Sequence, residues 1–134
     1  MQPIDKAYVQ EQLSFFVDKD VYLHLETTTG SYTALEPGGR QPVVAFIRNT
    51  KITFSRATIN GSGYYRVGLK MPSGWVYANG LTHHQCNERK ELLLHGIDDE
   101  GNLTVALQLA LQPFREDLFS WPNRLPQHEK RIYS

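Results

Sequence analysis

The residues best suited to chemistry are four polar side chains in two short stretches of the chain. His24 and Glu26 lie two positions apart in the run VYLHLETT, and His83 and His84 are adjacent in LTHHQC. Strand residues i and i+2 point to the same side, so an imidazole and a carboxylate would stand side by side. A third ligand from His83 or His84 would give a three-ligand metal site with an open position. Only one of these two histidines could join, because adjacent strand residues point to opposite faces.

The simpler interpretation of these residues is structural. A polar strand face and a pair of histidines need no metal, and short motifs of this kind often arise by chance. We therefore expect no cofactor and no tightly held metal, and we keep His24, Glu26, His83 and His84 as an alternative metal site. Cys86 follows His84 by two residues and suggests a thiol–imidazole pair, but a lone cysteine is more often a small apolar side chain. No residue is assigned a catalytic role.

A second candidate site is the hairpin in the run YYRVGLKMPSGWVYANGL, residues 64–81. Its Pro-Ser-Gly segment has the composition of a three-residue turn, which would pair Met71 with Trp75. That register places eight side chains on one face, and we assign this mostly apolar face to the core. The eight are Tyr65, Val67, Leu69, Met71, Trp75, Tyr77, Asn79 and Leu81.

The opposite face of this hairpin combines small residues with cations. The same register pairs Lys70 with Val76, Gly68 with Ala78 and Arg66 with Gly80. Glycine within a strand often marks the close approach of a backbone or a ligand, and Arg and Lys can hold an anion. An ordinary solvated face is the competing interpretation. The residues predicted to contact a ligand are Arg48, Arg66, Lys70, Tyr77 and His83.

The elements that must position these residues are one helix and a series of short strands. A helix is predicted over residues 4–17, with Asp5 as its N-cap and an apolar stripe at helical spacing. Alternation and turn signals predict strands, apart from the hairpin arms, at residues 21–28, 31–35, 43–47, 51–59, 91–97 and 103–111. Residues 43–47 form a nearly continuous apolar run, which predicts a strand buried on both faces. We expect turns at 29–30 and 60–63 and a loop at 36–42.

These elements predict a mainly β fold, a distorted antiparallel-rich sandwich or open barrel with one N-terminal helix. The length of 134 residues fits one domain, which we place at residues 1–112. Residues 113–134 are expected to form an extended or partly disordered tail. Fourteen basic and fourteen acidic residues give a neutral balance, which argues against nucleic acid or an anionic membrane as a partner. The single cysteine, the lack of a signal peptide and the lack of a membrane-length apolar run predict a cytoplasmic protein.

Three stretches, in order along the chain, resemble the YojF-like family of small bacterial proteins of unknown function. They are HLETTTGSY at 24–32, AFIRN at 45–49 and GYYRVGLKMPSGWVYANGLTHH at 63–84. The resemblance spans most of residues 1–112 and implies a distorted β-sandwich or barrel with an N-terminal helix. Genes of this family often neighbour a deacetylase of bacillithiol synthesis, which implies at most a link to thiol metabolism. The family supplies no established catalytic residues.

Taken together, these observations predict a non-enzymatic cytosolic binding or accessory protein linked to bacillithiol or thiol metabolism. It would dock a small anionic molecule or a partner enzyme, with the deacetylase as the candidate partner. A homo-oligomer is also compatible with the sequence. The alternative is a metal-dependent enzyme that uses the His24 and Glu26 strand face.

Overall fold

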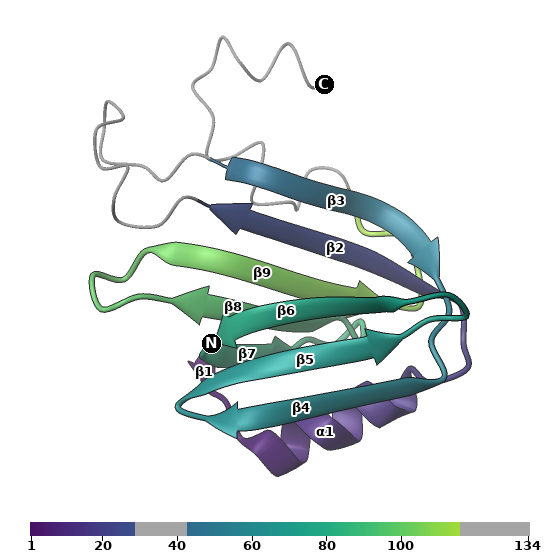
Figure 1. The fold of residues 1–134 in the computed structure, drawn as a ribbon, viewed down its shortest axis with the longest axis horizontal. Coiled ribbons are helices and arrows are strands. Elements are labelled where there is room, and N and C mark those ends of the chain that lie inside the picture. Colours follow the sequence, from purple (N-terminus) through teal and green to yellow (C-terminus); the bar gives the residue numbers. More distant parts are fainter. Residues whose placement is uncertain (29–42, 116–134) are drawn as a thin grey trace, which may run out of the picture.

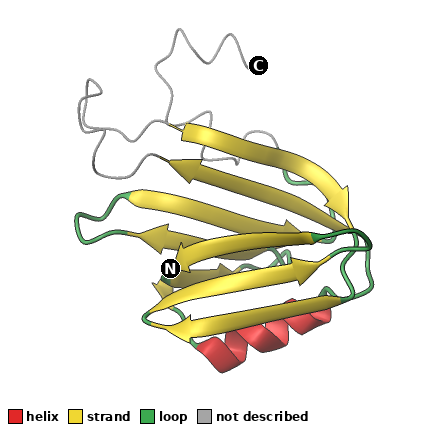
Figure 2. Ribbon diagram, in the orientation of Figure 1, coloured by secondary structure: helices red, strands yellow, loops and turns green. Residues whose placement is uncertain are grey.

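The computed structural model describes residues 1–28 and 43–115, and these residues form two antiparallel sheets with one helix (Figure 1). The larger sheet has the strand order β1-β7-β8-β9-β2-β3, and the smaller sheet has the order β4-β5-β6. The mainly β, sandwich-like fold predicted from the sequence is confirmed (Figure 2). The elements are β1 (Gln2–Pro3), α1 (Lys6–Phe15), β2 (Val21–Thr28), β3 (Val43–Ile52), β4 (Arg56–Ser62), β5 (Tyr64–Lys70), β6 (Trp75–Leu81), β7 (His83–Cys86), β8 (Leu92–Ile97) and β9 (Leu103–Ala110).

The core lies between the two sheets and is closed on one side by the helix. Alternate residues of β2, β8 and β9 point into it from the larger sheet, and Val67 and Leu69 point into it from the smaller sheet. Val9, Leu13 and Phe16 supply the apolar stripe of the helix. Each of these fully buried large side chains contributes about 1.5–3 kcal/mol by leaving water, so this shared core is what holds the sheets together.

Asp5 is the N-cap of the helix, as predicted, and the first helical residue is Lys6 rather than residue 4. The Asp5 carboxylate accepts a hydrogen bond from the backbone N–H of Tyr8 at 3.1 Å. The helix is shorter than the predicted span and ends at Phe15. The side chain of Gln10, in this helix, forms two hydrogen bonds with the backbone of β4. It donates to the carbonyl of Ala57 at 2.9 Å and accepts from the N–H of Ile59 at 3.1 Å. These two hydrogen bonds tie α1 to β4. Figure 1 shows the helix lying along this strand of the smaller sheet.

The prediction that residues 43–47 form a strand buried on both faces is wrong. This segment belongs to the longer strand β3, which pairs with β2 and is an edge strand of the larger sheet. The side chains of Phe46 and Ile47 are 37% and 41% exposed. A run of apolar residues shows only which side chains a strand carries. Whether they are buried depends on the position of the strand in the sheet, and β3 lies at its edge.

The predicted strand at 51–59 is divided in two. The strand β3 ends at Ile52, Phe54 turns into the core between the strands, and β4 begins at Arg56. The strands predicted at 21–28 and 103–111 are present as β2 and β9, and 91–97 as β8. The predictions for residues 29–42, and for the tail beyond residue 115, lie outside the residues that the structure describes.

The predicted register of the hairpin is shifted by one residue. The turn contains four residues, 71–74, so Lys70 pairs with Trp75 and Gly68 pairs with Tyr77. A one-residue slip moves every side chain of a strand to the other face. Consequently Trp75 and Tyr77 do not enter the core, and Val76 and Ala78 face inward instead.

A bulge near the end of β6 restores the predicted pairing of Tyr65 with Leu81. The register shifts between Tyr65 and Val67, and Gly80 in the partner strand has φ +80°, a conformation that glycine adopts readily. The Gly80 N–H donates a hydrogen bond to the side-chain oxygen of Asn79 at 3.0 Å. Asn79 is exposed at the surface and is not part of the core face predicted for it. Leu81 then returns to the core and is fully buried.

Candidate functional site

The outward side of the smaller sheet carries most of the residues predicted to contact a ligand. Cross-strand pairing aligns Arg56, Lys70 and Trp75 in one row and Thr58, Gly68 and Tyr77 in the next. Arg66 pairs with Asn60 and completes the set. We call this surface the basic aromatic face; its residues are Arg56, Thr58, Asn60, Arg66, Gly68, Lys70, Trp75 and Tyr77.

Two aromatic rings and a guanidinium are stacked on this face. The rings of Trp75 and Tyr77 lie 5.6 Å apart between centroids with an interplanar angle of 9°. The guanidinium carbon of Arg66 lies 5.3 Å from the Tyr77 centroid, within the range of a cation–π contact. The rings remain 42% and 54% exposed. An offset stack beside a cation is stable in water and can also accept a further planar or charged group.

Gly68 allows the rings to lie flat on the sheet. A Cβ atom on Gly68 would stand 2.9 Å from Cε1 of Tyr77 and 3.5 Å from Cε3 of Trp75. Any larger residue at this position would push the Tyr77 ring away, so the stacked arrangement of Trp75 and Tyr77 requires a glycine here. The sequence indicated a close approach at this glycine, but the group that approaches it is the protein's own tyrosine.

The basic aromatic face is positively charged. Arg56, Arg66 and Lys70 project from it and are exposed, and none of the three forms an ion pair with a carboxylate in the described part of the chain. The pairing rows place these cations on both sides of the aromatic stack. Exposed guanidinium groups can bind a carboxylate or phosphate bidentately, and lysine adds a point charge.

The structure separates the other two predicted contact residues from this face. Arg48 belongs to β3 and His83 to β7, so both lie in the larger sheet. Arg48 is half-buried, and burial lowers the pKa of its guanidinium. The Nδ1 atom of His83 is 2.6 Å from the hydroxyl of Thr82. The predicted contact set is therefore gathered only in part, as Arg66, Lys70 and Tyr77.

The predicted pairing of His24 with Glu26 is present on β2. The imidazole Nε2 lies 3.2 Å from a carboxylate oxygen of Glu26, and both side chains are fully buried. Gln108 stands opposite His24 in β9 and reaches His95 of β8, with 3.1 Å between their Nε2 atoms. This arrangement is a row of polar side chains across the larger sheet, in which His24, Glu26 and Gln108 are buried and His95 is half-buried.

The two candidate third ligands lie on opposite sides of β7. His83 pairs with His95 of the polar row, whereas His84 pairs with the buried Leu94 and points to the helix side. The ring of His84 packs 5.2 Å from that of Tyr8. Among residues 1–28 and 43–115, no three His, Cys, Asp or Glu side chains gather in a group that could hold a metal ion.

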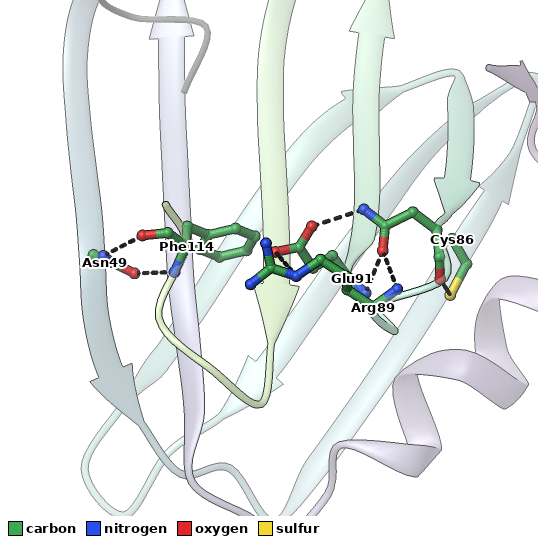
Figure 3. Close-up of polar contacts among 6 residues, drawn as sticks. Asn49, Cys86, Arg89, Glu91 and Phe114 are labelled. Atoms are coloured by element: carbon green, nitrogen blue, oxygen red, sulfur yellow. Dashed lines mark hydrogen bonds and ion pairs between the residues drawn. The ribbon is translucent and has the colours of Figure 1, made fainter. Parts of the chain in front are cut away.

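A pocket beside His84 was not predicted as a site. It lies between β1, the first turns of α1 and β7, has a volume of about 580 Å³, and is lined by Tyr8, His84 and Cys86 among others. Burial and the neighbouring Cys86 raise the pKa of Tyr8. The thiol of Cys86 lies 3.7 Å from the side-chain oxygen of Gln12, and Figure 3 shows it next to the turn that leads into β8. The His-x-Cys spacing was the sequence signal for this cluster, but the contribution of the helix could not be seen.

The fold and its surface define a small, open, two-sheet β protein with an N-terminal helix. The chain belongs to the family described as "Protein of unknown function (DUF1806)", which matches residues 3–114. It is 47% identical over 114 residues to the uncharacterized protein YojF of Bacillus subtilis strain 168, covering 85% of this chain and 98% of that protein. It is also similar to the crystal structure of Bacillus subtilis YojF, with a TM-score of 0.73 at 44% identity over 85% of this chain and 96% of that one. No helix in the described ranges is long and apolar enough to cross a membrane.

Proposed function

We propose that this protein is a non-enzymatic binding or accessory protein whose basic aromatic face docks an acidic partner surface. The candidate partner is the bacillithiol-synthesis deacetylase whose gene often neighbours those of the YojF-like family, which would link the protein to thiol metabolism. A small anionic molecule, such as a malate-linked sugar thiol, is the second candidate for the same face.

The observation that carries this proposal is the stack of Trp75, Tyr77 and Arg66 beside two further cations. Exposed aromatic rings supply apolar contact area at a low cost in side-chain entropy, and aromatic residues with arginine are enriched at protein interfaces. Arg56 and Lys70 lie in the row of Trp75, and Arg66 lies beyond the row of Tyr77, so an approaching carboxylate would meet positive charge at both ends of the stack. Such complementarity raises the association rate and selects acidic partners.

A protein partner is favoured over a small molecule by the position of the cavities. The pocket beside Cys86 and the smaller one beside Phe15 and Lys90 are both lined by residues away from the basic aromatic face. Small molecules are usually enclosed in a concave site, whereas a partner protein can use an open sheet surface.

The test is calorimetric titration of the deacetylase, and separately of a malate-linked sugar thiol, into the wild-type protein and the double variant Arg66→Ala, Lys70→Ala. Losing a charge-assisted contact costs about 1.5–3 kcal/mol, so affinity should fall roughly ten- to a hundredfold. Lys51→Ala is the matched control, because Lys51 is an exposed cation on β3 of the other sheet. Its affinity should equal that of the wild type.

Two results would count against this proposal. If a ligand binds equally well to the wild type and to the double variant, the basic aromatic face is not the docking surface. If neither the deacetylase nor the sugar thiol binds the wild type at any salt concentration, the link to thiol metabolism fails as well.

A further inference from the structure

Two asparagine–glycine pairs lie in the smaller sheet, and the structure holds their backbones differently. One pair is Asn60-Gly61 in β4, and the other is Asn79-Gly80 in β6. An asparagine followed by glycine is prone to deamidation, because glycine has no side chain to hinder attack by its own backbone nitrogen. Both asparagines are exposed, so water reaches both of them.

The pair in β4 is held in a regular strand ladder. Asn60 pairs with Arg66 and Gly61 pairs with Tyr65, and the pairing continues without interruption along the whole of β4. Deamidation requires the asparagine side chain to fold back onto the next peptide nitrogen. A paired extended strand opposes this movement until it opens locally. We therefore expect Asn60 to react slowly in the folded protein.

The pair in β6 lies in the bulge, where the ladder is interrupted. Ala78 and Leu81 have cross-strand partners in β5, whereas Asn79 and Gly80 have none in the pairing of these two described strands. Gly80 has φ +80°, and its N–H donates to the Asn79 side-chain oxygen at 3.0 Å. The side-chain amide of Asn79 therefore already lies beside the nitrogen that would attack it. A limited rotation about the neighbouring single bonds brings the amide carbon within reach.

We propose that Asn79 is a site of spontaneous deamidation, which converts its neutral amide into a carboxylate. The Gly80 nitrogen loses its proton to solvent base and attacks Cγ of Asn79. A new C–N bond forms, and the side-chain nitrogen takes a proton from solvent and leaves as ammonia. Water then opens the cyclic imide at either carbonyl, which leaves aspartate or isoaspartate at position 79.

The new carboxylate forms at the edge of the basic aromatic face. Asn79 follows Tyr77 by two positions, so it stands on the same side of β6 as the aromatic stack. Arg66 lies opposite the bulge, between the paired residues Tyr65 and Val67. A carboxylate beside this guanidinium cancels part of the positive charge offered to a partner. Deamidation therefore weakens docking as the protein ages, a consequence that rests on the proposed function.

The first experiment follows the conversion of both asparagines by peptide mass mapping of folded protein kept at mildly alkaline pH. Each rate is divided by the rate of the same asparagine in the chain unfolded in guanidinium chloride, which removes the effect of local sequence. After this correction Asn79 should react roughly tenfold faster than Asn60 or more, since only Asn60 requires a paired strand to open. Equal corrected rates, or a faster rate at Asn60, would overturn the proposal.

The variant Asn79→Gln tests the cyclic route. It keeps the amide but lengthens the side chain by one methylene, so the imide ring would be larger and would form far more slowly. Mapping of this variant should show no conversion at position 79 over the period in which the wild type reacts. Conversion at the wild-type rate would show that the reaction does not pass through attack by the Gly80 nitrogen.

The second experiment measures the effect of the charge on docking. Calorimetric titration of the deacetylase compares the wild type with Asn79→Asp, which carries the charge of the product. Affinity should fall roughly three- to tenfold, the effect of weakening one charge-assisted contact. Gln85→Glu is the matched control, because it makes the same change of charge at an exposed position on β7 of the larger sheet. Its affinity should equal that of the wild type.

The two experiments separate this proposal from the proposed function. If the deacetylase does not bind the wild type, the proposed function fails, and the mapping experiment decides the modification site by itself. If the wild type binds and Asn79→Asp binds equally well, deamidation has no effect on docking and that consequence is wrong.

Discussion

The side chain of Asn49 forms two hydrogen bonds with the backbone of Phe114. Its amide nitrogen donates to the Phe114 carbonyl at 3.0 Å, and its amide oxygen accepts from the Phe114 N–H at 2.8 Å (Figure 3). Asn49 has φ 58°, at the irregularity where β3 departs from regular pairing with β2. Asparagine tolerates this conformation better than most residues. This side chain therefore ties the segment after β9 to the outermost strand of the larger sheet.

Asn49→Ala should lower the free energy of unfolding by about 2–5 kcal/mol. Two hydrogen bonds contribute about 1–3 kcal/mol together, and alanine in the left-handed region costs about 1–2 kcal/mol. Asn49→Gly is the matched variant, since it loses the hydrogen bonds but keeps the backbone freedom, and it should lose less stability than Asn49→Ala. Urea unfolding followed by circular dichroism measures both. Wild-type stability in Asn49→Gly would mean that the two hydrogen bonds contribute nothing.

Gly68→Ala should destabilise the protein by displacing the Tyr77 ring. The added Cβ would lie 2.9 Å from the ring, so the stack with Trp75 would have to open. Such an aromatic pair contributes about 0.5–1.5 kcal/mol beyond its buried area, and this sets the expected loss. In a Tyr77→Ala background the same substitution should cost almost nothing, so a double-mutant cycle by urea unfolding should show positive coupling. Zero coupling would favour a register in which Gly68 faces a small residue.

Gly96→Ala should be far more damaging than its size suggests. A Cβ on Gly96 would meet the Gly80 carbonyl oxygen, and would lie 2.7 Å from Cγ1 of Val105. Neither a backbone atom nor a packed strand can retreat easily, and overpacking costs about 1–3 kcal/mol or more. Gly101→Ala is the control, because nothing lies within 4 Å of its Cβ position and only its φ of +83° opposes the change. Thermal unfolding should therefore show a larger drop in melting temperature for Gly96→Ala.

Purified protein is expected to hold no stoichiometric metal. The His24 and Glu26 pair is fully buried, and His84 points to the other side of its sheet. Elemental analysis after purification without chelators checks this expectation. About one zinc or iron per chain, lost on His24→Ala, would revive a metal site at this pair and with it the enzyme hypothesis.

The sequence by itself determined the features that depend on residues close together along the chain. The Asp5 cap located the start of the helix, and strict alternation in β2 and β9 predicted which side chains share a face. Both signals arise within a few residues along the chain, because capping and strand alternation are set by local backbone geometry. The pairing of His24 with Glu26 followed from the same two-residue period.

The tertiary structure decided the register, the burial and the grouping of the functional residues. One additional residue in the turn at 71–74 moved Trp75 and Tyr77 from the predicted core to the basic aromatic face, because a strand's period of two makes every slip a change of face. The outermost place of β3 left Phe46 exposed, and the placement of Arg48 and His83 in the larger sheet divided the predicted contact set. The pocket of His84 and Cys86 required α1 to pack beside β7. These outcomes depend on contacts between segments far apart in the chain, which local periodicity does not encode.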